Sequence, residues 1–170
     1  MEHTSEPRPK TVLAIASQGG HWVQLRRMRS AWAGCRVIYV TTQEGYRAEV
    51  MATEPDAEFL TVPDASRWDK LRLIRSAIQV AWILLRYRPD AVVTTGAAPG
   101  YFAIRIGHIL GARAIWVDSI ANCDALSMSG EKAGPHSDLW LTQWPHLAES
   151  QRAKQGRRVH RGPRYRGATI

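Results

Sequence analysis

The feature that most constrains the fold of this chain is a regular alternation of short apolar runs with longer helical patterns. Runs such as Val37-Ile38-Tyr39-Val40 carry no polar face, which is typical of strands in a parallel sheet that helices cover on both sides. The alternation therefore predicts an α/β domain built on such a sheet. We expect strands at about 11–17, 36–41, 58–62, 91–95, 114–118 and 138–143, and helices at about 20–33, 45–53, 66–87, 99–111 and 145–154.

The turn after the first expected strand reads Ser17-Gln18-Gly19-Gly20-His21. Paired glycines let the backbone turn sharply, and the helix beyond them directs unpaired N–H groups at the same point, which favours an anion. The turn lacks the full G-x-G-x-x-G pattern and the Lys-Ser/Thr of a P-loop, so a diphosphate or phosphosugar fits better than a dinucleotide or hydrolysed ATP. His21 is a candidate general base or phosphate donor; the alternative is that it only orders the helix start.

Two further loops follow expected strands and should meet this turn, because ligands bind beyond the carboxyl ends of strands in open α/β sheets. One is the small-residue stretch from Thr94 to Gly100, and the other runs from Asp118 to Asn122. Asp118 could accept from a sugar hydroxyl or act as a base. The alternative is that it caps the next short helix.

The segment 66–87 combines an apolar stripe with tryptophans and flanking cations. Trp68, Trp82, Arg72 and Arg75 suggest a helix lying in a membrane interface. A buried crossover helix is the alternative, and both hold if one side packs and the other meets lipid. The sequence contains no apolar run of about 18 residues, so it does not predict a spanning helix.

The formal net charge of +8 is concentrated in the last twenty residues, which hold seven basic and no acidic side chains. The preceding residues hold sixteen basic and fifteen acidic side chains and are nearly neutral. We expect a disordered N-terminus at 1–10, one domain at 11–150 and a basic C-terminal tail at 151–170. The tail suits anionic lipid, nucleic acid or an acidic partner, and the alternative is a solvated, disordered terminus. The two cysteines are isolated, which indicates reduced thiols rather than a zinc site.

Four motifs occur in order over about 11–147: Ser17-x-Gly19-Gly20-His21, Thr95 to Gly100, Asp118-Ser119 followed by Leu126 to Gly130, and Gln143-Trp144-Pro145. In this order they resemble the membrane-anchor subunit family of the two-component UDP-GlcNAc transferase of dolichol-linked oligosaccharide synthesis. They resemble still more its bacterial relatives in exopolysaccharide and capsule assembly. Eukaryotic members begin with a spanning helix that is not seen here, and many relatives have glutamate where Asp118 stands.

The resemblance implies the Rossmann-like, acceptor-side N-terminal half of a GT-B glycosyltransferase, completed by a partner subunit that binds the nucleotide sugar. The implied reaction transfers a sugar to a polyprenyl-diphosphate-linked acceptor at the cytoplasmic face of the membrane. No metal or cofactor is expected, since no D-x-D pair occurs. The candidate catalytic residues are His21 and Asp118, and the candidate acceptor-binding residues are Ser17, Gly19, Gly20, Thr95, Gly96, Gly100, Ser119 and Asn122.

Two other functions compete with this one. The chain could be a non-catalytic scaffold that recruits and activates its partner, in which case replacing His21 would leave turnover intact. A nucleic-acid-binding module would depend on the arginine tail and weaken steeply with salt. The tail carries no aromatic residue except Tyr165, and the body is nearly neutral, so we expect no nucleic-acid partner.

Overall fold

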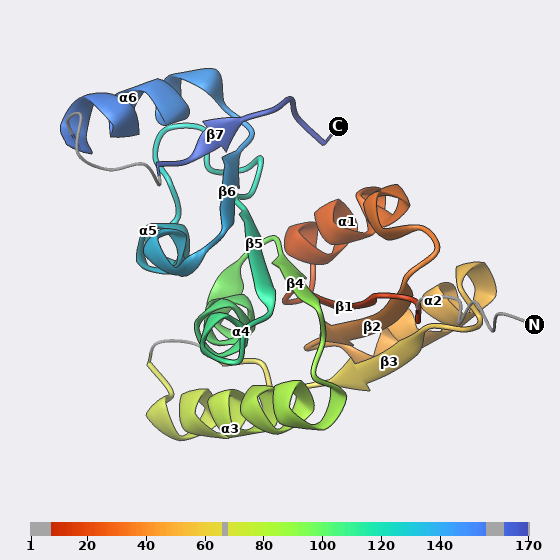
Figure 1. The fold of residues 1–170 in the computed structure, drawn as a ribbon. Helices are drawn as coiled ribbons and strands as arrows, with labels where there is room; N and C mark the ends of the chain where they lie inside the picture. The colour runs from red at the N-terminus through yellow and green to blue at the C-terminus, as the bar shows by residue number, and fades with distance from the viewer. Residues whose placement is uncertain (1–7, 66–67, 156–161, 170) are drawn as a thin grey trace, which may run out of the picture.

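The fold is a parallel sheet of seven strands in the order β3-β2-β1-β4-β5-β6-β7 (Figure 1). The computed structural model describes residues 8–65, 68–155 and 162–169. Every neighbouring pair of strands runs parallel. The strands are β1 (Thr11–Ile15), β2 (Arg36–Thr41), β3 (Glu58–Thr61), β4 (Ala91–Thr94), β5 (Arg113–Val117), β6 (Leu139–Thr142) and β7 (Arg164–Tyr165).

Helices cover both faces of this sheet, with α1 on one face and α3 and α4 on the other (Figure 1). The helices are α1 (Gly20–Arg27), α2 (Arg47–Thr53), α3 (Lys70–Tyr87), α4 (Ala97–Ile109), α5 (Met128–Ala133) and α6 (Pro145–Gln155). Short 3₁₀ turns lie at Arg29–Trp32, Glu44–Tyr46 and Gly134–His136. The predicted doubly covered parallel sheet is confirmed.

The central strands bury alternate side chains in two separate cores. On β1, Leu13 and Ile15 join the core beneath α3 and α4, whereas Val12 and Ala14 join the core beneath α1 and α2. Successive side chains of a strand point to opposite faces, so a strand buried on both sides needs an unbroken apolar run. This is why the apolar run of β2 predicts its place inside the sheet.

The structure differs from the expected elements in local ways. The first helix stops at Arg27 and continues as a 3₁₀ turn. The helix expected from residue 66 begins at Lys70, because the Asp69 carboxylate caps it by accepting from the Arg72 N–H at 3.0 Å. The expected ranges include neither α5 nor β7.

The predicted terminal segments lie partly outside the described residues, including 1–7 and 156–161. At the N-terminus, Lys10 is already tied to the domain: its carbonyl accepts from the Arg36 N–H, and its ammonium contacts Asp90 at 3.3 Å. At the C-terminus, Arg164 and Tyr165 pair with Leu141 and Thr142 of β6. Part of the expected tail therefore completes the sheet.

The chain reverses its direction of travel across the sheet between β1 and β4. From β1 it proceeds outward through β2 to β3, then crosses back to β4 and continues outward to β7. The helices that follow β1 and β4, α1 and α4, therefore lie on opposite faces of the sheet (Figure 1), and open α/β sheets bind ligands at such a switch point.

Candidate functional site

His21 joins the two loops that meet between β1 and β4. Its Nδ1 lies 2.8 Å from the carbonyl oxygen of Thr95, and the Thr95 hydroxyl donates to the His21 carbonyl at 2.6 Å. Residues 74 positions apart thus form a reciprocal pair of hydrogen bonds. The structure brings together His21, Thr95 and Gly96, as the sequence predicts for the first two loops.

This pairing fixes the tautomer of the imidazole. A carbonyl oxygen can only accept, so the neutral ring carries its proton on Nδ1 and a lone pair on Nε2. Among the described residues, no hydrogen bond reaches Nε2. The ring is half-buried. His21 therefore presents an oriented proton acceptor at the sheet edge.

Gly96 makes room for the His21 ring. It has φ +137°, and a Cβ at this position would lie 2.7 Å from His21 Cε1 and 2.9 Å from Nδ1. A side chain here would be strained and would also displace the imidazole. Ala97, the next residue, has φ +66°, a conformation that non-glycine residues seldom adopt. The second loop is thus tightly shaped around His21.

Gly100 lies where α4 packs against the end of β4. It is buried, and an added Cβ would lie 2.1 Å from the Thr94 hydroxyl. The glycine lets α4 pack closely on the end of β4. We expected an acceptor-binding residue; its position supports a packing function instead.

The glycine turn after β1 is held by residues that follow β2. The Gly19 N–H donates to the Tyr46 hydroxyl at 3.1 Å, and the Gln18 N–H donates to Thr42 Oγ1 at 3.0 Å. Gly19 has φ +76°, and nothing lies within 4 Å of a Cβ built on Gly19 or Gly20. No side chain caps α1. The turn is therefore open, with the first-turn N–H groups of α1 facing that space.

Asp118 is a buried hub of the third loop. Only 1% of the surface of Asp118 is exposed to solvent. Oδ1 accepts from the Ser119 N–H at 3.0 Å and from Asn122 Nδ2 at 2.5 Å, and Oδ2 accepts from the N–H and the hydroxyl of Ser127, both at 3.2 Å. A carboxylate with four donors and no open side is suited to shaping a loop. This geometry supports a positioning role instead of the expected catalytic one.

The other residues predicted in the third loop serve the same hub. Asn122 uses its amide on Asp118, and the Ser119 hydroxyl accepts from the Ala121 N–H. Ser119 is buried, as is Ser17 at the end of β1. Ser127, not Asp118, caps α5 by accepting from the Gly130 N–H at 2.9 Å.

Helix α3 has one buried and one exposed apolar face. Val80, Ile83 and Leu84 join the core. The exposed face, which we call the α3 stripe, consists of Leu71, Ile74, Ile78, Trp82 and Leu85, and Trp68 lies just before the helix. Ile78 is 65% exposed and Trp82 is 60% exposed. The predicted packing of one side of this helix is confirmed, and contact of the exposed side with a membrane stays a prediction.

Cations flank the α3 stripe. Arg72 is exposed and pairs with Asp69 at 3.2 Å, and Arg75 lines a hollow of about 350 Å³ with Ile78, Gln79 and Trp82. In the part of the chain that the structure describes, no helix is long and apolar enough to cross a bilayer.

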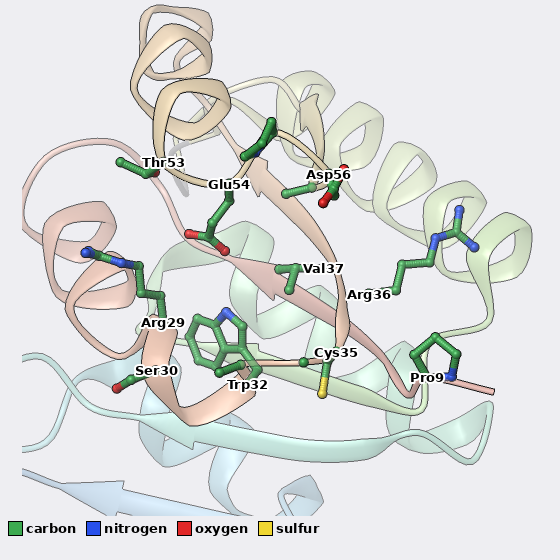
Figure 2. A pocket seen from close by; sticks show the side chains of 14 residues that line it. Pro9, Arg29, Ser30, Trp32, Cys35, Arg36, Val37, Thr53, Glu54 and Asp56 are labelled. Atoms are coloured by element: carbon green, nitrogen blue, oxygen red, sulfur yellow. The ribbon is translucent and has the colours of Figure 1, made fainter. Parts of the chain in front are cut away.

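A larger cavity of about 690 Å³ lies at the opposite end of the sheet, where β2 begins (Figure 2). Figure 2 shows the Glu54 carboxylate pointing toward the Trp32 indole. Between them, Tyr39 Oη donates to Glu54 Oε2 at 2.9 Å and accepts from Trp32 Nε1, and burial raises the pKa of Tyr39 to about 12. Arg26 closes the network on Glu54 at 2.5 Å. These groups are mutually paired and lie away from His21.

The sequence did not reveal Tyr46, which holds the first loop, or Gln24 and Gln143, which hold the third loop. Tyr46 carries no local motif, and its contact with Gly19 depends on how β2 lies beside β1. Gln143 stands in one of the recognised motifs, but its partners are 25 or more positions away. Only the pairing of the strands reveals these contacts.

Structural comparison confirms the class of fold. The chain matches MurG from Acinetobacter baumannii with a TM-score of 0.65 at 13% identity, covering 82% of this chain and 43% of that one. It matches UDP-GlcNAc 2-epimerase from Methanocaldococcus jannaschii with a TM-score of 0.60 at 13% identity, covering 86% and 43%. The chain thus has the Rossmann-like fold of the N-terminal half of GT-B glycosyltransferases and spans less than half the length of these proteins.

Sequence comparison finds similar proteins that share one name. The chain is 25% identical over 173 aligned residues to the UDP-N-acetylglucosamine transferase subunit ALG14 of Eremothecium gossypii, covering 85% of this chain and 77% of that protein. It is 26% identical over 165 residues to the subunit of the same name from Yarrowia lipolytica, covering 83% and 76%. The resemblance to the UDP-GlcNAc transferase subunit, inferred from the four motifs, is confirmed, and the greater likeness to exopolysaccharide and capsule proteins stays a prediction. No protein-family model matches the chain.

Proposed function

We propose that this chain is the acceptor-side subunit of a two-component glycosyltransferase. It acts with a nucleotide-sugar-binding partner to transfer a sugar to a polyprenyl-diphosphate-linked acceptor. The similarity to transferase subunits named ALG14 supports the reaction class. The observation that carries the proposal is His21, held by Thr95 at the switch between β1 and β4 with Nε2 available.

In this proposal His21 Nε2 takes the proton of the attacking acceptor hydroxyl. The hydroxyl oxygen forms a bond to the anomeric carbon of the donor sugar, and the bond from that carbon to the nucleoside diphosphate breaks. The leaving diphosphate takes the bonding electrons. Thr95 keeps the imidazole oriented throughout, because its carbonyl holds the Nδ1 proton.

The open turn at Gly19 and Gly20 is the proposed site for the acceptor diphosphate. Nothing lies within 4 Å of a Cβ added to either glycine, so a phosphate can approach the backbone closely. The N-terminus of α1 contributes N–H groups and the positive end of the helix dipole. The proposal needs no metal to hold the diphosphate.

The α3 stripe is the proposed membrane contact, at the cytoplasmic face where the lipid-linked acceptor would be reached. Apolar side chains at i, i+3 and i+4 spacings form one exposed face of α3. Arg72 and Arg75 beside it suit anionic headgroups. Peripheral binding through this face would bring the acceptor to the same molecule that carries His21.

The test is His21→Ala in the assembled pair. Loss of a general base typically lowers the rate about 10²–10⁴-fold, and we expect a decrease of that size with the fold intact. The measurement is transfer of radiolabelled sugar to a polyprenyl-diphosphate acceptor. Turnover within about threefold of wild type would support the scaffold alternative and contradict our proposal.

A further inference from the structure

Gln143 and Trp144, which follow β6, form hydrogen bonds to the loop that follows β5. Gln143 Nε2 donates to the Asp118 carbonyl at 3.0 Å, and Trp144 Nε1 donates to the Ile120 carbonyl at 2.9 Å. The far side of the Gln143 amide accepts from the N–H and hydroxyl of Thr169, at 2.8 and 2.9 Å. The motif thus fixes the third loop from one side.

Gln24 of α1 forms hydrogen bonds to the same loop from the other side. Its Nε2 donates to the Asp118 carbonyl and its Oε1 accepts from the Ile120 N–H, both at 3.3 Å. Gln24 and Gln143 are each only 4% exposed. A buried backbone group that loses its partner costs free energy, so these contacts hold the loop and α1 in one arrangement.

Gln24 lies one turn beyond His21 on the same helix. Helix α1 is therefore fixed at two points: His21 is bonded to the β4 loop through Thr95, and Gln24 is bonded to the β5 loop. Rotation of α1 about its axis would break both contacts. The direction of His21 Nε2 depends on this rotation.

We infer that Gln24, supported by Gln143 and Trp144, is a positioning residue that sets the orientation of His21 through α1. The inference rests on the proposed function for its catalytic consequence. Its structural part concerns only this chain and is tested without a partner. Asp118 shapes the loop from within, whereas these three side chains dock it against its neighbours.

The structural part is tested by hydrogen exchange and by ring NMR of His21 in the chain alone. In Gln24→Leu, the Ile120 amide should exchange about tenfold faster, because its acceptor is gone. The His21 ring shifts should change from a single Nδ1–H tautomer to a mixture of tautomers. Trp144→Phe, which removes only the indole donor, should give a smaller change in the same direction.

Trp140→Phe is the matched control, because the buried Trp140 indole N–H has no partner among the described residues. It removes the same chemical group from the same strand region without removing a hydrogen bond. We expect no change in Ile120 exchange or in the His21 ring. If Gln24→Leu also leaves both signals unchanged while the chain remains folded, the inference is overturned.

The catalytic part is tested in the assembled pair. Gln24→Leu should lower kcat about tenfold with the KM for nucleotide sugar unchanged, whereas Trp140→Phe should leave kcat within twofold. A kcat within twofold of wild type in Gln24→Leu, despite altered His21 shifts, would overturn the positioning role. An inactive wild-type pair would contradict the proposed function, and the exchange and NMR results would still decide the docking contacts.

Discussion

At the scale of single residues, the site depends on how closely two loops approach each other. The His21 ring occupies the space that a side chain at position 96 would need. Thr95 forms hydrogen bonds to His21 through both its carbonyl and its hydroxyl. The glycine and the histidine are therefore one unit. A change at either should alter the direction of Nε2.

We predict that Gly96→Ala lowers turnover of the assembled pair by at least tenfold. The added methyl would lie 2.7 Å from His21 Cε1 and must displace the ring. Gly34→Ala is the control, because Gly34 also has a positive φ, at +80°, but nothing lies within 4 Å of an added Cβ. Both variants carry backbone strain, and at Gly96 (φ 137°, ψ −165°), in a region that is almost exclusive to glycine, it is about 1–3 kcal/mol. Equal activities in a steady-state transfer assay would show that the contact with His21 is unimportant.

Asp118 offers a second test at this scale. Asp118→Asn should lower the free energy of unfolding by about 1–3 kcal/mol, since an amide cannot accept from all four donors that face the carboxylate. Urea denaturation measures the change. The control is Asp124→Asn, an exposed carboxylate in the same loop. If the unfolding midpoint is unchanged and turnover is lost, the result would contradict the positioning role and support a catalytic role for Asp118.

The predictability of these residues from sequence was uneven for a physical reason. His21 and Gly96 stand in turns whose composition identifies them locally. Gly100 stands in the same stretch as Gly96, but its contact is with Thr94 and follows from helix packing. Composition locates the sheet edge, whereas the direction in which each residue faces depends on tertiary contacts.

At the scale of elements, α3 is the unusual helix because it is apolar on two sides. Its inner residues pack under the sheet, and the α3 stripe faces outward. A helix that only crosses between strands needs one apolar face. The second face is a large exposed apolar surface of the kind that marks a contact with lipid or protein.

We predict that the double substitution Ile78→Glu and Trp82→Glu lowers binding to anionic liposomes by at least tenfold. Each buried apolar side chain contributes about 1.5–3 kcal/mol, and the new charges would oppose anionic lipid. Flotation at low and high salt measures the loss, and wild-type binding should weaken as salt rises. Met128→Glu is the control, because Met128 is 55% exposed but lies on α5. An equal loss in this control would mean that the α3 stripe is not the lipid contact.

Elements were predictable where periodicity is strong. The six expected strands exist, because each carries a run of apolar or β-branched residues. Strand β7 could not be predicted, since Arg164 and Tyr165 have no such pattern and pair with β6 only in the folded chain. Helix α5 was missed because Gly130 within it and the Gly134-Pro135 pair after it favour turns.

At the scale of the whole molecule, the described residues form one Rossmann-like sheet, and the proposed site lies at its carboxyl edge. The part of this chain that aligns with the MurG structure covers only 43% of that chain. The proposed reaction needs a donor site as well as an acceptor site. Here His21 and the glycine turn open on the carboxyl edge, where a second domain would complete the cleft.

The most direct measurement is sugar transfer to a polyprenyl-diphosphate acceptor. It is made with this chain alone, with the nucleotide-sugar-binding partner from the same organism alone, and with both chains together. We predict turnover only when the two chains are combined, because each supplies half of the site. If the pair is active and His21→Ala abolishes this activity, the result would support two claims: that the enzyme is divided between two chains, and that His21 is the general base. Robust turnover by this chain alone would contradict the half-enzyme account.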